Sequence, residues 1–314
     1  MSLRSFYLEK QLAMEKLGEH QIQWYPGHIA KHERELGNQL KLVDVVVEVL
    51  DARLPSTTTN KRLEAKIRTR PTVVVLNKAD LADEQVTSRW RQHLKKSASK
   101  VILYETKTPR YQKNLLNAIL EAGEEKLKQL EAKGLKRRPL RVLVVGMPNV
   151  GKSSLINHIV GKKKTKTGHK AGVTRTHQWV RIHPGIELLD SPGIIPPSLE
   201  SNDAGNLLAI VSSIGEAAFD DEEVAKFLLN RLEALYPKKL AECYKLSAEI
   251  ETNLASIASA RNFQTLGAEP DTLRAAQTLL AEFRHGKLGK LSLECPELTI
   301  EKAAASPNDE TTAE

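Results

Sequence analysis

The chain has 314 residues, of which 40% are hydrophobic, and this is enough for about two domains with apolar cores. Lys and Arg outnumber Asp and Glu by 47 to 39, so the formal net charge is +8 and a negatively charged partner such as RNA is favoured. No apolar run approaches the roughly twenty residues that cross a bilayer. Glu9 and Glu15 do not fit a secretion signal or a transit peptide, and Cys243 and Cys295 match no metal-binding spacing. We expect a cytoplasmic monomer without a membrane or DNA partner.

The first predicted elements are a helix and a buried strand. Residues 2–20 predict a lead helix whose apolar side chains can dock on the main domain. Residues 43–50 are mostly apolar despite Asp44 and Glu48, as expected of a strand covered on both faces. Asp51 and Arg53 close this strand, and we interpret them as a structural ion pair or turn, with a nucleotide contact as the alternative.

A second strand, 72–76, runs into Asn77-Lys78-Ala79-Asp80. The Asp80 carboxylate can accept from the ring N1–H and the exocyclic amine of guanine, a pair of donors that adenine lacks on that edge. Asn77 would bond the N7 side of the purine, and the Lys78 stem would cover the base. This tetrapeptide therefore predicts a guanine-reading loop, and it argues against an ATP-using protein.

The strand 141–145 leads into Gly146-Met147-Pro148-Asn149-Val150-Gly151-Lys152-Ser153 and then into a helix start. A strand, a glycine loop and a helix N-terminus together direct several backbone N–H groups at one spot, which forms a phosphate cradle. Gly146 and Gly151 allow backbone angles that a Cβ would forbid. Lys152 would reach the β- and γ-phosphates, and the Ser153 hydroxyl would bind Mg²⁺.

The strands 177–182 and 186–189 precede Asp190-Ser191-Pro192-Gly193, which suits a loop that meets the γ-phosphate. Asp190 would hold Mg²⁺ through water, and the Gly193 N–H would sense the third phosphate. Three such motifs, each at a strand end, predict a guanine-nucleotide site.

The order of the motifs differs from that of ordinary small GTPases, because the guanine-reading segment precedes the phosphate loop. The strand 101–103 leads into Glu105-Thr106-Lys107, a loose match to the Ser-Ala-Lys turn that touches guanine, with Glu105 in place of a small residue. A doubly wound sheet tolerates such rearrangement because its element ends lie near one another at the surface.

These motifs, in this order and together with Trp24-Tyr25-Pro26-Gly27-His28, Asp51-Ala52-Arg53 and Gly172-Val173-Thr174, resemble the YlqF/RbgA family of circularly permuted ribosome-assembly GTPases. The resemblance covers about residues 20 to 290. It implies a GTPase that acts in late assembly of the large ribosomal subunit, with a C-terminal helical domain that helps engage ribosomal RNA.

Hydrolysis needs a positioned water, and many GTPases place a Gln directly after the Asp-x-x-Gly motif. That position is Ile194, so either intrinsic hydrolysis is slow or another group acts. The resemblance puts His28 near the catalytic region, where an imidazole can polarise water. The alternative is a turn or RNA contact for His28, with His169 and His177 as weaker candidates.

Thr174 is the expected switch hydroxyl on Mg²⁺, with Thr176 as second choice. The resemblance makes a K⁺ site at Asn149 plausible, and the alternative is a loop-stabilising Asn. The predicted catalytic residues are His28, Lys152 and Gly193. The predicted GTP-binding residues are Asn77, Lys78, Asp80, Glu105, Thr106, Lys107, Asn149, Val150, Gly151, Lys152, Ser153, Ser154, Thr174 and Gly193.

The fold expected is α/β: a circularly permuted, doubly wound, mainly parallel sheet followed by an all-helical domain. We expect the lead helix over 1–20, the GTPase domain over 21–197, the helical domain over 198–290 and a disordered tail over 291–314. Two helices are predicted by Val224, Leu228, Leu232 and Leu235, and by Leu273, Leu279, Leu280 and Phe283, the second starting at Pro270-Asp271.

Two basic clusters could bind RNA phosphates or could be solvated charge runs. One comprises Lys162, Lys163, Lys164, Lys166 and Lys170, and the other Lys133, Lys136, Arg137, Arg138 and Arg141. The sequence thus favours a slow GTPase stimulated by the large ribosomal subunit, and the alternative is a GTP-dependent RNA-binding switch with incidental hydrolysis.

Overall fold

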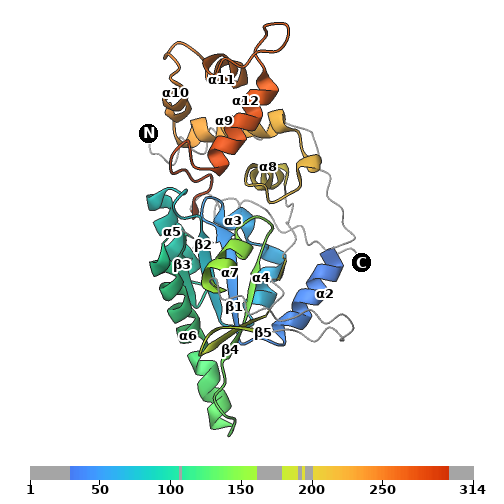
Figure 1. The fold of residues 1–314 in the computed structure, drawn as a ribbon, viewed down its shortest axis with the longest axis vertical. Helices are drawn as coiled ribbons and strands as arrows, with labels where there is room; N and C mark the ends of the chain where they lie inside the picture. The colour runs from blue at the N-terminus through green and yellow to red at the C-terminus, as the bar shows by residue number, and fades with distance from the viewer. Residues whose placement is uncertain (1–28, 106–107, 161–178, 190–192, 195–200, 297–314) are drawn as a thin grey trace, which may run out of the picture.

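The computed structural model of the chain describes residues 29–105, 108–160, 179–189, 193–194 and 201–296. An α/β part and a helical part are stacked along the long axis of the molecule (Figure 1). The expected lead helix over 2–20 lies outside the described residues.

The α/β part is built on a sheet that has seven strands within the described ranges. They are β1 Val45–Asp51, β2 Thr72–Asn77, β3 Lys100–Leu103, β4 Leu140–Gly146, β5 Trp179–His183, β6 Ile186–Leu189 and β7 Gly193–Ile194. The order is β3-β2-β1-β4-β6-β5, with β7 beside β4, and among these strands β5 alone pairs in an antiparallel manner. The mainly parallel sheet is confirmed, with the guanine-motif strand β2 preceding the phosphate-loop strand β4.

The central strands are buried because helices cover both faces of the sheet. These helices are α2 Ile29–Leu40, α3 Pro55–Thr58, α4 Lys61–Ile67, α5 Glu84–Leu94, α6 Pro109–Ala132 and α7 Lys152–Val160. On one face α6 contacts α7, where Gln112 Nε2 donates to the Ile159 carbonyl at 3.1 Å. Elsewhere α2 packs on α4. Every residue of β1 and β2 is buried.

Two carboxylates near β1 are compensated by arginines. Glu48, fully buried in β1, pairs with Arg68 at 2.7 Å. Asp44, just before the strand, accepts from both terminal nitrogens of Arg138, at 2.7 and 3.0 Å. Buried carboxylates are tolerated only when they are paired in this way, which explains how a strand containing them remains in the core.

The helical part contains α8 Asn202–Ile210, the 3₁₀ turn η2 Glu216–Ala218, α9 Asp221–Leu235, α10 Lys239–Tyr244, α11 Leu254–Ala260 and α12 Thr272–Arg284. Asp220 caps α9 by accepting from the N–H groups of Glu222 and Glu223, and Asp271 caps α12 at the expected position. Leu273 differs from expectation: it lies in the first turn of α12 at the edge of the buried face and is 51% exposed.

A single cluster of buried apolar side chains extends from the sheet into α8, α9, α11 and α12. After α12 the chain returns to the α/β part, and we call residues 286–294 the C-terminal strap. Leu291 and Leu293 of the strap are 3% and 0% exposed, so residues 291–296 belong to the packed structure. The disordered tail expected over 291–314 was therefore predicted to begin too early in the chain. Among the described helices, none combines the length and apolar character that a bilayer crossing requires.

Candidate nucleotide-binding site

The glycine loop joins β4 to α7 in a conformation that only glycine adopts readily. Gly151 has a φ of +98°, and a Cβ added there would lie 2.2 Å from Asn77 Nδ2. A Cβ on Gly146 would lie 2.6 Å from the Val49 carbonyl oxygen. The first turn of α7, whose N–H groups lack intrahelical partners, contains Lys152, Ser153 and Ser154, and both serines are exposed. The loop therefore has the form of an anion cradle.

The ammonium group of Lys152 lies inside this loop. It is 8% exposed and donates to the Met147 carbonyl at 2.6 Å. Burial disfavours the charged form and lowers the pKa of Lys152 to about 8. A phosphate group in the cradle would reverse this penalty, because it would supply an opposite charge that the described residues around Lys152 do not provide.

The guanine motif, residues 77–80 at the end of β2, directly contacts the glycine loop, residues 146–153. Asn77 Nδ2 donates to the Val150 carbonyl, 73 residues away in sequence, at 2.8 Å. Lys78 Nζ donates to the Asn149 carbonyl at 2.9 Å. The loops meet at the carboxyl ends of the parallel strands, where the strand order reverses between β1 and β4, which is the usual place for ligands in such sheets.

Asp51 and Arg53 form the structural ion pair that the sequence suggests. Arg53 Nη2 lies 2.8 Å from Asp51 Oδ2, and both side chains are almost completely buried. Asp51 also pairs with Lys78 at 2.9 Å. Burial alone would raise the pKa of Asp51, but Arg53 and Lys78 outweigh it and hold the pKa far below its ordinary value.

The same ion pair reaches the helical part. Arg53 Nη1 donates to the Phe283 carbonyl at the end of α12 at 3.1 Å. The guanidinium group also stacks over the Phe283 ring, 4.9 Å from its centroid. Arg53 therefore joins a strand end beside the site to the last turn of α12.

The glycine loop has a second connection to the helical part, through the turn after α8. Asn149 Nδ2 donates to the Ser212 carbonyl at 2.6 Å, and Ser213 Oγ donates to the Pro148 carbonyl at 2.9 Å. The sequence analysis missed these two serines, because isolated serines in a turn give no local signal.

The remaining expected site residues divide into three groups. Glu105 is partly buried and accepts from the Thr108 hydroxyl, and Asp80 is partly buried beside the loop. Gly193, in β7, is the parallel partner of Val145 at the end of the phosphate-loop strand. His28, Thr106, Lys107, Thr174 and Asp190 lie outside the described residues, as do His169, Thr176 and His177.

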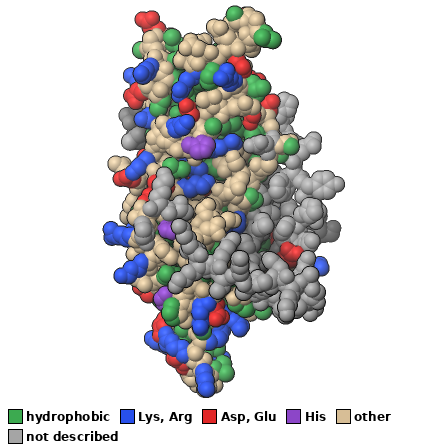
Figure 2. Space-filling view, viewed as in Figure 1, with side chains coloured by type: hydrophobic (Ala, Val, Ile, Leu, Met, Phe, Trp, Pro, Cys, Tyr) green, Lys and Arg blue, Asp and Glu red, His purple; other side chains and the backbone are tan. Residues whose placement is uncertain are grey.

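The basic cluster before β4 is largely engaged within the protein. Arg137 pairs with Glu124 at 2.8 Å, Arg138 pairs with Asp44, and Arg141 stacks over Trp179 at 5.0 Å. On the face shown in Figure 2, basic and acidic side chains are intermixed. Lys133 and Lys136 remain exposed, and the cluster over 162–170 lies outside the described residues.

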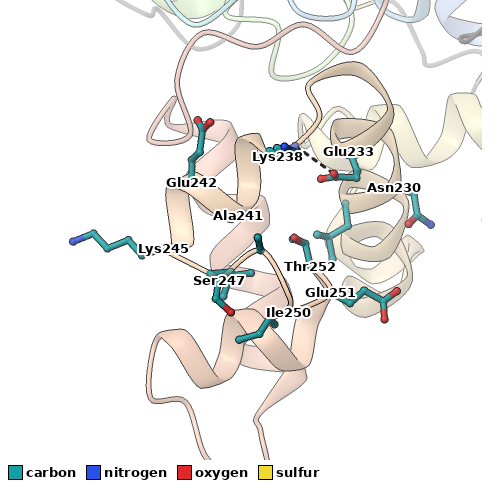
Figure 3. Close-up of a pocket in the computed structure, with 13 residues that line it drawn as sticks. Asn230, Glu233, Lys238, Ala241, Glu242, Lys245, Ser247, Ile250, Glu251 and Thr252 are labelled. Atoms are coloured by element: carbon teal, nitrogen blue, oxygen red, sulfur yellow. Dashed lines mark hydrogen bonds between the residues drawn. The ribbon is translucent and has the colours of Figure 1, made fainter.

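A separate cavity of about 660 Å³ lies between α9, α10 and the loop that follows α10. Lys245, Glu242 and Glu251 at its rim extend away from the enclosed space (Figure 3). None of the described residues of the nucleotide motifs lines it, so we assign the nucleotide site to the glycine loop.

Comparisons with known proteins agree with this assignment. The sequence profile of the family described as "50S ribosome-binding GTPase" matches residues 141–254. The chain is 38% identical over 279 residues to Ribosome biogenesis GTPase A of Bacillus licheniformis, covering 88% of this chain and 99% of the relative. For the protein of that name from Thermotoga maritima the identity is 32% over 280 residues, covering 88% and 95%.

Among solved structures, GNP-bound YlqF from T. maritima superposes with a TM-score of 0.60 at 29% identity, covering 85% of this chain and 99% of that one. The GDP-bound YlqF structure gives the same TM-score, 0.60, at 30% identity. The glycine loop, the guanine motif placed before it and the near-complete coverage of these relatives lead to one conclusion: the chain belongs to the Ribosome biogenesis GTPase A (YlqF) family of circularly permuted GTPases.

Proposed function

We propose that this protein binds and hydrolyses GTP in the cytoplasm and acts in late assembly of the large ribosomal subunit. The observation that carries the proposal is the direct contact between the guanine motif and the glycine loop, through Asn77 to Val150 and Lys78 to Asn149. The proposed role in ribosome assembly is supported by relatives that are named for ribosome biogenesis and that this chain matches over nearly their whole length.

In this proposal the protein binds GTP by its two ends. Asp80 reads the guanine edge, while the backbone of residues 149–154 and the Lys152 ammonium group bind the phosphates. Residues 105–107 border the base, and Thr174 and Gly193 contact the terminal phosphate region.

The chemistry of the donors fits Mg²⁺. The Ser153 hydroxyl is an exposed oxygen at the start of α7, and hard oxygen ligands are those that Mg²⁺ prefers. Thr174 would be a second ligand from the protein, and Asp190 would hold the ion through water. When bound, the metal would neutralise charge on the phosphates. We also propose that the Asn149 side-chain oxygen contributes to a K⁺ site, since the amide nitrogen of that side chain is already bonded to Ser212.

We propose slow intrinsic hydrolysis, because Ile194 stands where many GTPases have Gln and an isoleucine side chain can neither donate nor accept a hydrogen bond. His28 is the residue we propose to orient the water. Control of subunit binding by the nucleotide is supported by the bonds from Asn149 and Ser213, since they couple the glycine loop to the helical part that would contact ribosomal RNA. The second candidate, an RNA-binding switch with incidental hydrolysis, rests on this same coupling.

The test is GTP turnover by the purified protein in K⁺ and Na⁺ buffers, with and without large ribosomal subunits. Stimulation by the subunit that depends on K⁺ and is lost in His28→Ala supports the whole proposal. Stimulation that survives His28→Ala removes the histidine from the mechanism. Tight GTP binding without any stimulation favours the binding switch.

A further inference from the structure

The C-terminal strap, residues 286–294, contacts the loop that follows the guanine motif. The Leu291 N–H donates to the Leu81 carbonyl at 3.0 Å. The Asp83 N–H donates to the Ser292 hydroxyl oxygen at 3.2 Å. Gly286 lies so close to Leu81 that an added Cβ would be 2.7 Å from a Leu81 methyl carbon. The strap therefore contacts the chain immediately after Asp80.

The guanine-reading loop is consequently held from two sides. On one side, Asn77 and Lys78 bond the glycine loop at 2.8 and 2.9 Å. On the other side, Leu81 and Asp83 bond the strap. Asp80 stands between these two sets of anchors, so the position of its carboxylate depends on both.

The strap is itself fixed on the helical part and on α3. The Tyr236 hydroxyl donates to the Ser292 carbonyl at 3.1 Å and accepts from the Ser292 N–H at 2.9 Å. Arg231 donates twice to the Leu293 carbonyl, at 3.0 and 2.8 Å. At the far end the Glu294 carboxylate accepts from the N–H groups of Ser56 and Thr57, at 2.8 and 3.1 Å. These contacts make the strap a fixed support.

We propose that the C-terminal strap positions the guanine-reading loop, with Ser292 as a positioning residue for base selectivity. The proposal deepens the proposed function and rests on the GTP site assigned there. Within the described part of the chain, Ser292 forms hydrogen bonds with Asp83 and Tyr236 and with no residue of the predicted nucleotide site. It acts through the Asp83 backbone, three residues beyond the carboxylate that discriminates guanine.

A comparison of two nucleotides that differ only in the base can test the position of the Asp80 carboxylate. Inosine triphosphate has the N1–H and the same phosphates as GTP but lacks the exocyclic amine that Asp80 would accept from. A displaced Asp80 carboxylate weakens GTP binding more than inosine triphosphate binding, because only GTP loses the second hydrogen bond. The phosphate contacts are shared, so the ratio of GDP to GTP affinity stays constant.

The experiment measures dissociation constants for GTP, GDP and inosine triphosphate with the full-length protein and three variants. Ser292→Ala removes the acceptor for the Asp83 N–H. Tyr236→Phe loosens the strap from α9 without touching the guanine loop. Ser259→Ala is the matched control, because Ser259 is exposed and its hydroxyl donates only within its own helix, to the Ala255 carbonyl.

Wild type and Ser259→Ala should prefer GTP over inosine triphosphate to the same degree. In Ser292→Ala this preference should fall by roughly threefold to tenfold, the range set by one hydrogen bond, and in Tyr236→Phe by less. An unchanged preference in Ser292→Ala, or equal weakening of both nucleotides, refutes the strap proposal alone. Absence of any preference in wild type refutes the guanine site, and the strap proposal with it.

Discussion

Replacing Arg53 with methionine should lower the free energy of unfolding more than any surface charge change would. Methionine preserves the length and most of the apolar stem of the side chain but removes the guanidinium group. The change deletes the stacking on the Phe283 ring and three hydrogen bonds: the Nε and Nη2 bonds to Asp51, at 2.9 and 2.8 Å, and the Nη1 bond to Phe283. It leaves the Asp51 carboxylate, 0% exposed, with Lys78 as its remaining cation.

Removing one partner of a buried ion pair typically destabilises a protein by about 3–5 kcal/mol, because the other charge remains desolvated. Urea unfolding followed by circular dichroism at neutral pH should show a loss of about this size for Arg53→Met. The double variant Asp51→Asn/Arg53→Met should lose clearly less than the sum of the two single losses, because it removes both members of the buried pair and leaves no buried carboxylate without its arginine.

The matched control is Arg181→Met, since Arg181 is 60% exposed and pairs with Glu187 at 3.7 Å. Such exposed pairs contribute about 0–1 kcal/mol. A loss below about 1 kcal/mol in Arg53→Met, or strictly additive losses in the double variant, would refute the reasoning.

The loss of stability in Arg53→Met should also change with pH in a defined direction. The folded-state pKa of Asp51 lies below the ordinary value of 3.8, so the ion pair stabilises the protein above that pH and the stabilisation is lost as acid protonates the carboxyl. The difference between wild type and Arg53→Met should therefore be largest near neutral pH and narrow on acidification.

Three further predictions concern the glycine loop and the helical core. Gly151→Ala places a Cβ 2.2 Å from Asn77 Nδ2 at a residue with a φ of +98°, so it should weaken GTP binding roughly tenfold or more. The control is Gly37→Ala, which should leave GTP binding unchanged because nothing lies within 4 Å of its added Cβ. Because burial lowers the pKa of Lys152 to about 8, nucleotide binding should take up more protons at pH 9 than at pH 7, as measured by calorimetry in buffers of different ionisation enthalpy; equal uptake at both pH values would contradict this. Leu228→Ala, at a fully buried site in α9, should lower the unfolding free energy by about 2–5 kcal/mol, whereas Leu266→Ala, at a fully exposed one, should change it by less than about 0.5 kcal/mol in the same urea assay.

The sheet could be predicted from the sequence because its central strands are continuous apolar runs with polar motifs at their ends. β2 and β4 are the clearest examples: their runs end at Asn77 and Gly146, and the structure brings those ends together. The predicted structural ion pair of Asp51 and Arg53 is also confirmed. In each case the pattern at a single strand end was enough to predict the element, although the contact from Asn77 to Val150 joins two motifs 73 residues apart.

The contacts between the two parts could not be predicted in this way. Arg53 bonds the Phe283 carbonyl 230 residues away, and a backbone acceptor carries no sequence signal. The strap did offer a faint signal: apolar Leu291 and Leu293 alternate with Ser292 and Glu294, as in a half-buried extended segment. The acidic composition of the following residues obscured it.

The position of the strap in the chain has a consequence for biosynthesis. A ribosome makes Asp83 209 residues before it makes Ser292, the group that accepts the Asp83 N–H. The residues of the phosphate cradle would therefore be synthesised long before the strap that supports the guanine-reading loop. The part of the preference for guanine that depends on the strap would then be acquired only after residues 286–294 have been synthesised.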